Sequence, residues 1–298
     1  MEKYNLKMNS SDTDAPAIPV SRFPVYGFVG VVVIGLSEIM LFLGVKIVGV
    51  WFTPLAWTGY ILFVDALNVR VRGGSLIRSR PREFLAMLPW SVCCWLIFEG
   101  YNFYLRNWEY VGLPENEFWR AFGYAWSFAT IFPAILETAE LFEALQSRYN
   151  GKSVSIGSGI VYGMILAGVA CLVVPLLVRQ EIASTLFGFV WIGAYLLLDP
   201  VNYRIGGNSV LGELRRGSRS RLYALALSGI VCGILWEFWN YWAIAKWKYV
   251  VPIPFAGPKI FEMPLLGFLG FIPFAFECYA MQEMLIGVFP GLRRGNSN

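Results

Sequence analysis

Long runs of apolar residues, interrupted by short polar segments, extend over most of the chain. A helix that crosses a bilayer needs about 20 predominantly apolar residues. Runs of about this length predict eight membrane-spanning helices, at residues 24–46, 50–68, 83–105, 118–145, 154–178, 183–203, 221–243 and 261–288. The pattern therefore predicts an all-α polytopic integral membrane protein.

Polar positions inside the apolar runs recur in the same order in the two halves of the chain. Three pairs of segments match: WTGYILFVDALNVR (57–70) with WIGAYLLLDPVNYR (191–204), FEGYNFYLRNWEY (98–110) with WEFWNYWAIAKWKY (236–249), and PAILETAELFEAL (133–145) with PFAFECYAMQEML (273–285). The third match aligns Glu137 with Glu277. General apolar similarity does not account for repeated polar residues. We therefore predict two parallel four-helix repeats, related by a pseudo-two-fold axis along the membrane normal.

The repeat sets the expected domain boundaries. We expect a polar, disordered tail at residues 1–22, a first repeat at 23–145, a linker at 146–153, a second repeat at 154–288 and a short basic tail at 289–298. The first tail is too long and too acidic for the basic start of a cleaved signal peptide.

Composition and charge agree with a membrane location and predict an orientation. Hydrophobic residues make up 57% of the 298 residues and charged residues 15%, against about 25% charged in a typical soluble protein. With an even number of spans, both tails and three loops lie on one side and hold 17 of the 24 basic residues. The positive-inside rule makes this side cytoplasmic. We expect an inner-membrane protein with cytoplasmic termini and no nucleic-acid partner, and the sequence is compatible with a homo-oligomer.

Carboxylates inside the apolar runs are the candidate catalytic residues. A charged side chain at the bilayer centre costs roughly 2.5–3.5 kcal/mol on insertion scales, so it normally faces an interior cavity and marks function. Glu99, Glu137, Glu237 and Glu277 occupy such positions. Desolvation favours the protonated carboxyl group, which is then a usable general acid. The alternative is that these glutamates only join helices through hydrogen bonds.

Polar and aromatic residues near these glutamates form the expected surroundings of the site. Two Glu-x-x-Asn pairs place Asn102 beside Glu99 and Asn240 beside Glu237 on one helix face. The aromatic residues expected to exclude water and stabilise a cation are Trp108, Trp236, Trp239, Tyr241, Trp242 and Trp247. Near the cytoplasmic helix ends lie Asp65, Asn68, Asp199 and Asn202, for which hydrogen bonding is favoured over Mg²⁺ binding.

Histidine and cysteine usage limits the chemistry further. The chain has no histidine, which excludes histidine ligands, histidine general bases and Ser–His triads. Its five cysteines lie in apolar runs and lack CxxC or CxxH spacing. We therefore predict no metal site and no cofactor.

The second half resembles a known family in the order of its motifs. Trp236-Glu237, the turn WKYVVP (247–252), and a helix with Pro273 and Glu277 follow one another. This order resembles the membrane-embedded lycopene cyclase domain of carotenoid biosynthesis, whose members contain a repeated small helical domain. The resemblance covers roughly a third of the chain. The spacing between Pro273 and Glu277 is longer here than in the P-x-E motif of that family.

The resemblance implies proton-initiated cyclisation of an isoprenoid. A protonated Glu237 or Glu277 would donate to a terminal carbon–carbon double bond, and a second carboxylate would later remove a proton. The side chains that would shield the carbocation are Trp236, Trp239, Tyr241 and Trp242. The expected partner is then a membrane lipid or an isoprenoid substrate.

Two other functions fit the same residues. Paired Glu and Asn sites between the repeats suit a transporter for a small solute, protons or cations. A non-catalytic lipid-binding membrane protein is the other alternative. An enzyme requires an apolar cavity with a lateral opening to lipid, whereas a transporter requires carboxylates along a path that connects to both aqueous sides.

Overall fold

The helices follow the apolar runs of the sequence. The computed structural model of the chain describes residues 21–146, 149–250 and 258–293, so residues 1–20 of the first predicted tail and 294–298 of the second lie outside the described residues. Within the described residues, seven helical segments are long and apolar enough to cross a membrane: α1 (Val25–Phe42), α2 (Lys46–Arg72), α4 (Pro81–Leu105), α7 (Ser158–Leu177), α8–η1–α9 (Gln180–Arg204), α11 (Ser220–Trp242) and η2–α12 (Leu265–Val288). The chain is an all-α membrane protein.

The predicted span at 118–145 is divided into two shorter helices, so the prediction of one continuous helix was wrong in this place. They are α5 (Glu117–Ala129) and α6 (Ile131–Leu145). The break at Thr130 is supported by Ser91 of α4, whose hydroxyl donates to the carbonyl of Phe128 and accepts from the N–H of Phe132. Backbone groups freed at a helix end need such partners. The apolar run continues through Thr130, so its pattern alone predicts one helix.

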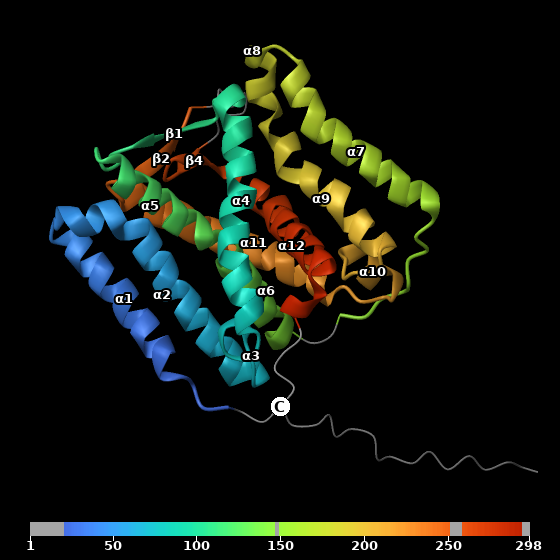
Figure 1. Cartoon of the computed structure of the whole chain (residues 1–298), viewed down its shortest axis with the longest axis horizontal. Coiled ribbons are helices and arrows are strands. Elements are labelled where there is room, and N and C mark those ends of the chain that lie inside the picture. Colours follow the sequence, from blue (N-terminus) through green and yellow to red (C-terminus); the bar gives the residue numbers. More distant parts are fainter. Residues whose placement is uncertain (1–20, 147–148, 251–257, 294–298) are drawn as a thin grey trace, which may run out of the picture.

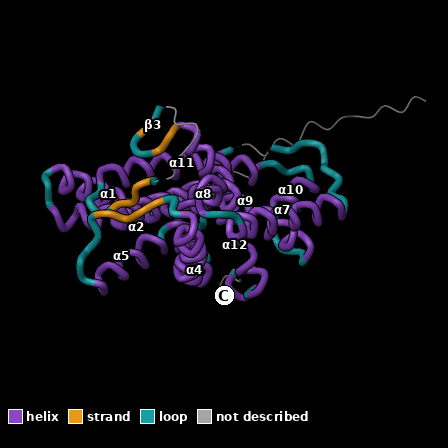
Figure 2. The backbone as a smooth tube through the Cα atoms, turned by 90° about the horizontal axis from the view of Figure 1, so that it is seen from above, coloured by secondary structure: helices purple, strands orange, loops and turns teal. Residues whose placement is uncertain are grey.

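Short elements occupy the two ends of the helical layer. They are α3 (Leu76–Ser79), α10 (Val210–Arg215), η3 (Pro290–Leu292) and the strands β1 (Trp108–Val111), β2 (Lys246–Tyr249), β3 (Lys259–Ile260) and β4 (Met263–Pro264). The end with α3, α10 and the last described residues is the arginine-rich end, and the end with β1 and β2 is the ribbon end (Figure 1). Seen from above, the helices spread into a broad and shallow layer (Figure 2).

Aromatic rings fill the centre of this layer. The pair α1–α2 lies at one side and the pair α7–α9 at the other, with α4, α6, α11 and α12 between them (Figure 1). The ring of Trp236 in α11 lies 5.3 Å from that of Trp57 in α2 and 6.4 Å from that of Trp95 in α4. Trp191 of α9 meets Phe274 of α12 at 4.8 Å. The core therefore joins residues far apart in the sequence.

Strands β1 and β2 form an antiparallel ribbon across the ribbon end. Trp108 pairs with Tyr249, and Tyr110 pairs with Trp247. Because side chains alternate along a strand, these four aromatic residues project from one face of the ribbon. The ribbon joins a strand of the first half to a strand of the second half and covers the aromatic core.

Helix α1 packs against α2 at contacts that only glycine permits. A Cβ atom at position 30 would clash with the carbonyl oxygen of Gly59 in α2. Helices α7 and α9 approach one another similarly, because a Cβ at position 168 would lie 2.9 Å from the carbonyl oxygen of Gly193. Small residues at helix interfaces allow membrane helices to pack closely.

We expect Gly30→Ala to lower the free energy of unfolding by about 1–3 kcal/mol, because the added methyl group forces α1 away from α2. A methyl group added at Gly35 of the same helix would meet no atom of another segment within 4 Å. Gly35→Ala is therefore the matched control, and we expect it to be neutral or slightly stabilising. Thermal unfolding in detergent compares the two variants. Equal stability of both would contradict the close packing at Gly30.

Candidate functional site

A cavity lies beneath the ribbon, between the two halves of the chain. Residues of α2, α4, α5 and β1 line it from the first half, and residues of α9, α11, β2 and α12 line it from the second. Seven of the twelve tryptophans contribute to the wall. About 100 Å³ of its space is open to the centre of a water molecule. We call it the aromatic cavity.

A second hollow, the lateral groove, adjoins the aromatic cavity. Its volume is about 610 Å³, and it is lined by apolar and aromatic residues of α2 and α5 and of the loop after β1. The residues shared by both hollows are Val50, Trp51, Leu113 and Pro114. Ile47 and Trp119 of the groove are 64% and 51% exposed, so the groove opens on the side of the helical layer. The groove leads from the surface of the molecule to the aromatic cavity.

Glu99 of α4 binds three aromatic donors in the cavity wall. Its Oε1 accepts from the indole N–H of Trp95 at 2.8 Å, from that of Trp108 at 3.1 Å and from the hydroxyl of Tyr110 at 2.5 Å. Hydrogen bonds to a charged acceptor are among the stronger ones in proteins. Glu99 therefore fixes the rings of α4 and β1 relative to one another.

Glu237 of α11 reaches the cavity through Tyr249. Its Oε1 accepts from the Tyr249 hydroxyl at 2.7 Å, and the indole N–H of Trp247 donates to the same hydroxyl at 3.0 Å. Glu237 is fully buried, and its Oε2 has no partner among the described residues. A buried carboxyl oxygen without a donor suits a protonated carboxyl group. Glu237 thus differs from Glu99, which is only partly buried and accepts from three donors.

Tyr110 and Tyr249 are the groups through which the two carboxylates meet the cavity. Burial, and next the charge of Glu99, raises the pKa of Tyr110 well above its ordinary value. Burial raises the pKa of Tyr249 in the same way. Both phenols therefore remain protonated and donate hydrogen bonds.

Asn102 and Asn240 position the ribbon. The side-chain oxygen of Asn102 accepts from the N–H of Asn107 at 2.7 Å and of Trp108 at 3.1 Å, and its amide donates to the Trp108 carbonyl at 2.9 Å. Asn240 accepts from the N–H of Trp247 at 3.0 Å and donates to its carbonyl at 2.9 Å. Each Glu-x-x-Asn pair therefore orients one strand, the glutamate through side chains and the asparagine through the backbone.

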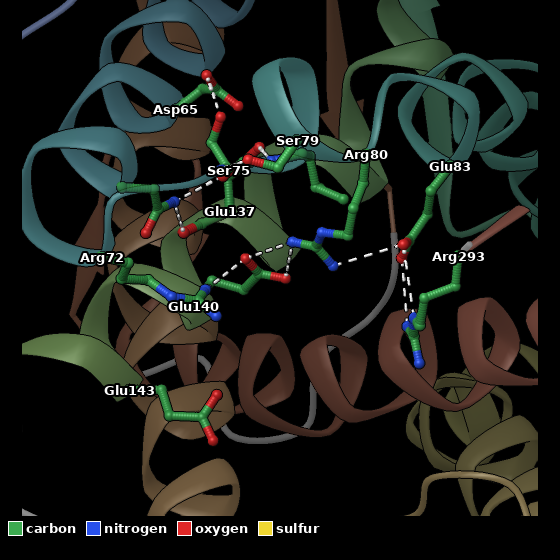
Figure 3. Close-up of polar contacts among 12 residues, drawn as sticks. Asp65, Arg72, Ser75, Ser79, Arg80, Glu83, Glu137, Glu140, Glu143 and Arg293 are labelled. Atoms are coloured by element: carbon green, nitrogen blue, oxygen red, sulfur yellow. Dashed lines mark hydrogen bonds and ion pairs between the residues drawn. The ribbon is translucent and has the colours of Figure 1, made fainter. Parts of the chain in front are cut away.

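Glu137 and Glu277 lie outside the lining of the aromatic cavity. Glu277 of α12 accepts the N–H of Ala194 in α9 at 2.9 Å. Glu137 of α6 lies near the arginine-rich end, where it accepts from the side chain of Asn68 at 2.6 Å and from the N–H of Leu76 at 3.3 Å (Figure 3). The four candidate glutamates therefore do not converge on one site.

Asp65 and Asp199 accept hydrogen bonds from the starts of the two short helices at the arginine-rich end. Asp65 accepts from the N–H of Ile77 at 2.9 Å. Asp199 accepts from the N–H of Val210 at 2.7 Å and of Leu211 at 3.0 Å. A carboxylate is favourable where helical N–H groups are free. These hydrogen bonds thus stabilise the conformation of the loops that follow α2 and α9.

Asn68 and Asn202 identify the corresponding positions of α6 and α12. Asn68 donates to the carbonyl of Glu137, and Asn202 donates to the carbonyl of Ala280, both at 2.9 Å. The sequence match pairs Glu137 with Glu277, whereas the contact of Asn202 lies three residues further on, at Ala280. One helical turn has 3.6 residues, so a shift of three residues leaves the apolar face of a helix almost unchanged. A comparison of apolar and polar positions therefore does not detect such a shift.

Alternating charges cross the arginine-rich end in a connected series (Figure 3). The pairs are Arg72–Glu140, Arg80–Glu140, Arg80–Glu83, Arg293–Glu83 and Arg293–Glu283. The three glutamates are at most 8% exposed. The series connects α2, α4, α6 and α12 with the last described residues, and it holds these helices together rather than facing the cavity.

The predicted aromatic set is divided between the cavity and the outer surface. Trp108, Trp236 and Trp247 line the cavity. Trp239 packs behind the wall and donates its N–H to Glu38 at 3.1 Å. The side chains of Tyr241 and Trp242 are 38% and 56% exposed, because their positions turn away from the helix face that carries Trp236. The expectation that these two residues surround a ligand was wrong for this cavity.

Ten further aromatic residues line the cavity and were not selected from the sequence. They are Trp51, Trp57, Trp95, Tyr110, Tyr124, Phe128, Trp191, Tyr249, Phe271 and Phe274. Four of them form two matched pairs in the comparison of the halves, Trp57 with Trp191 and Tyr110 with Tyr249. The sequence could have indicated these four residues, because they match between the two halves as the carboxylates do.

Comparisons of the chain with protein-family models, with curated proteins and with solved structures gave no match. The function is therefore inferred from the geometry and chemistry of the site.

Proposed function

We propose that the protein is a membrane enzyme that transfers a proton to an isoprenoid lipid in the aromatic cavity. The observation that carries this proposal is the 2.7 Å contact between Glu237 and Tyr249. Tyr249 lies in the cavity wall, and the second oxygen of Glu237 is buried without a partner among the described residues. A buried acid connected to an apolar cavity is suited to general acid catalysis.

The lateral groove supports a lipid substrate. A lipid that enters between α2 and α5 keeps its tail in the groove and brings one end into the aromatic cavity. A transporter is less favoured, because the carboxylates at the arginine-rich end are occupied by asparagine, arginine and backbone donors. The lateral opening also matches the entry that a lipid-modifying enzyme requires.

The proposed chemistry needs only residues of the chain. In the reaction this hydrogen bond reverses its direction: neutral Glu237, protonated at Oε1, donates its proton to the Tyr249 oxygen while Tyr249 donates its own proton to a carbon–carbon double bond of the lipid. The resulting carbocation faces the rings of Trp95 and Trp236, whose π faces stabilise positive charge. A second double bond of the same chain closes a ring. An adjacent carbon then loses a proton to the relay, which restores Tyr249 and Glu237.

We also propose that the chain consists of two four-helix repeats in the inner membrane, with the arginine-rich end and both termini in the cytoplasm. Corresponding contacts support the repeat: each half has an aspartate that binds the start of a short helix, and an Asn that orients a strand. The basic residues near the arginine-rich end support the orientation, because positively charged loops are retained in the cytoplasm. The ribbon and the cavity then lie in the outer half of the membrane.

Lipid analysis tests the proposed function. The protein is expressed in bacteria that make isoprenoid quinones and linear carotenoids, and extracted lipids are compared by mass spectrometry and chromatography. We expect wild type to form a product of unchanged mass and altered retention. Glu237→Gln should form at least about tenfold less, because the amide cannot supply the proton.

Glu277→Gln is the matched control, since Glu277 is equally buried and lies outside the cavity lining. We expect it to retain the wild-type product. Identical lipids in cells with wild type and in cells without the protein would contradict the proposed function. Equal product from wild type and Glu237→Gln would contradict the role of Glu237.

A further inference from the structure

We infer that the arginine-rich end carries a binding site for the phosphate group of an anionic phospholipid, where α9 meets α7 and α10. The central residues of this site are Arg204, at the end of α9, and Arg215, at the end of α10. The site lies apart from the aromatic cavity and does not depend on the proposed reaction. It is supported by arginines without carboxylate partners, by tyrosine rings beneath them, by a matched contact in the first half and by an apolar stripe along α7.

The arginines of this end form two groups. The first group pairs with glutamates and holds the helices together: Arg72, Arg80, Arg221 and Arg293. The second group, which includes Arg70, Arg204 and Arg215, is exposed, and the described residues place no carboxylate oxygen within 4.0 Å of it. An anion from outside the chain can therefore neutralise the second group.

Two tyrosine rings hold the central arginines in place. The guanidinium of Arg204 lies over the ring of Tyr162 in α7, 4.9 Å from its centre. The guanidinium of Arg215 lies 6.0 Å from the centre of the Tyr203 ring and donates to the Tyr203 hydroxyl at 2.9 Å. A ring contacts the face of a guanidinium and leaves N–H groups at its edge free. Because Tyr203 directly precedes Arg204, both arginines are supported at the last turn of α9.

The matched arginine of the first half already has an oxygen acceptor. Arg70 matches Arg204 in the comparison of the halves, and it donates to the carbonyl of Ser21, just before α1, at 3.1 Å. Among the described residues, no carbonyl or carboxylate accepts from Arg204, whose contact is with the ring of Tyr162. A phosphate oxygen would supply in the second half the acceptor that Ser21 supplies in the first.

Arginine, rather than lysine, is the basic residue of this end. Lys152 is the one lysine that the described residues place there, whereas β2 and β3 alone carry Lys246, Lys248 and Lys259. Retention of a loop in the cytoplasm requires positive charge from either residue type. The planar guanidinium also forms paired hydrogen bonds with a phosphate group, which an ammonium group does not. The residue type therefore fits phosphate binding in addition to orientation.

An apolar stripe on α7 favours a lipid over a free phosphate ion. The stripe starts at Tyr162, which supports Arg204, and continues through the exposed residues Leu166, Val169, Val173 and Leu177. Residues three or four apart share one face of a helix. Helix α7 forms the edge of the helical layer, where lipid surrounds a membrane protein (Figure 1). Acyl chains that lie along this stripe bring the phosphate group of the same lipid to Arg204.

Lipid binding to the purified protein tests the inference. Protein in detergent is titrated with phosphatidylglycerol, which is anionic, and with phosphatidylcholine, which is zwitterionic. Native mass spectrometry measures the bound lipid, and thermal unfolding measures the stabilisation that each lipid gives to the folded protein. A third arm adds inorganic phosphate and distinguishes a free anion from a lipid head group.

We expect phosphatidylglycerol to bind at least about tenfold more tightly than phosphatidylcholine, because two arginines meet its phosphate group. Arg204→Gln and Arg215→Gln should each weaken phosphatidylglycerol binding about fivefold, since each removes one positive charge from the site. Arg204→Lys keeps the charge and loses the paired hydrogen bonds, so it should weaken binding about twofold to threefold. Arg70→Gln is the matched control, and we expect a change of less than about twofold, because Ser21 already occupies that arginine.

Each outcome decides for or against the site. Equal affinity of wild type for the two lipids would overturn the inference. Equal weakening by Arg204→Gln and Arg70→Gln would show attraction by overall charge alone and would overturn a site at Arg204. Stabilisation by inorganic phosphate equal to that by phosphatidylglycerol would overturn the lipid as its ligand. Should a glutamine variant not fold, the comparison of lipids on wild type and on Arg204→Lys still decides.

Discussion

Tyr249→Phe is expected to lower the rate of lipid conversion by about 10²–10⁴-fold, the range typical of general acid–base catalysis. Phenylalanine keeps the ring in the cavity wall and removes the hydroxyl that connects Glu237 to the cavity. The effect should exceed that of Glu237→Gln, because the glutamine variant still leaves a phenol beside the substrate. Product formation over time, normalised to folded protein in the membrane, measures the change.

Tyr110→Phe is the matched control for Tyr249→Phe. Both tyrosines donate to a glutamate and line the cavity. Glu99 keeps two indole donors when Tyr110 is removed, so its position should be preserved. We expect a decrease of less than about tenfold for Tyr110→Phe, below the usual contribution of an acid–base group. A larger loss of product formation for Tyr110→Phe than for Tyr249→Phe would show that Tyr110, in the first half, is the proton donor.

Glu140→Ala is expected to destabilise the fold by about 3 kcal/mol, because it leaves two arginines without their shared partner. Glu140 binds Arg80 at 2.6 Å and Arg72 at 2.5 Å. Removal of one member of a buried ion pair costs about 3–5 kcal/mol. The lower end applies, since the Arg72 side chain is 37% exposed and is partly screened by solvent. Reversible unfolding in mixed micelles measures the loss.

Glu117→Ala provides the comparison for Glu140→Ala. The Glu117 side chain is 91% exposed, and its contact with Arg120 is 3.7 Å. Exposed pairs of this kind contribute about 0–1 kcal/mol. A second variant that removes both Glu140 and Arg80 should recover part of the stability, because it removes a stranded charge. Equal unfolding free energies for Glu140→Ala and Glu117→Ala would show that the charged series at the arginine-rich end does not hold the helices.

Helix positions could be predicted because a bilayer-length apolar run has few alternative structures. The run from 118 to 145 is the exception, since its break depends on Ser91 of another helix. The match of Glu137 with Glu277 differs from the contacts of Asn68 and Asn202 for a related reason. Periodicity fixes which face of a helix is apolar. The positions of α6 and α12 along their axes, relative to α2 and α9, depend on the contacts of Asn68 and Asn202.

The candidate site could be predicted only in part. Glu237 and Asn240 are evident from the sequence because polar residues in an apolar run are rare. Tyr249, the partner of Glu237, lies on a strand, and a short strand in an aromatic segment has no distinct sequence pattern. The contact of Trp57 with Trp236 joins residues from opposite halves of the chain, and one sequence alone does not define such a contact. The outward direction of Trp242 was accessible from helical periodicity.

The register of the ribbon makes each strand a suitable partner for a copy of itself. Trp108 pairs with Tyr249, and Tyr110 pairs with Trp247, so the Trp-x-Tyr of one strand meets the Tyr-x-Trp of the other when read in the opposite direction. An isologous dimer requires this reciprocity, in which residue i meets j while j meets i. Under the proposed repeat, two separate copies of a half-length chain would pair through the same strands and enclose the same kind of cavity. The two halves of the single chain therefore pair through the ribbon as two subunits of a symmetric dimer would. Because both halves are in one chain, each can change its sequence independently and acquire a different role.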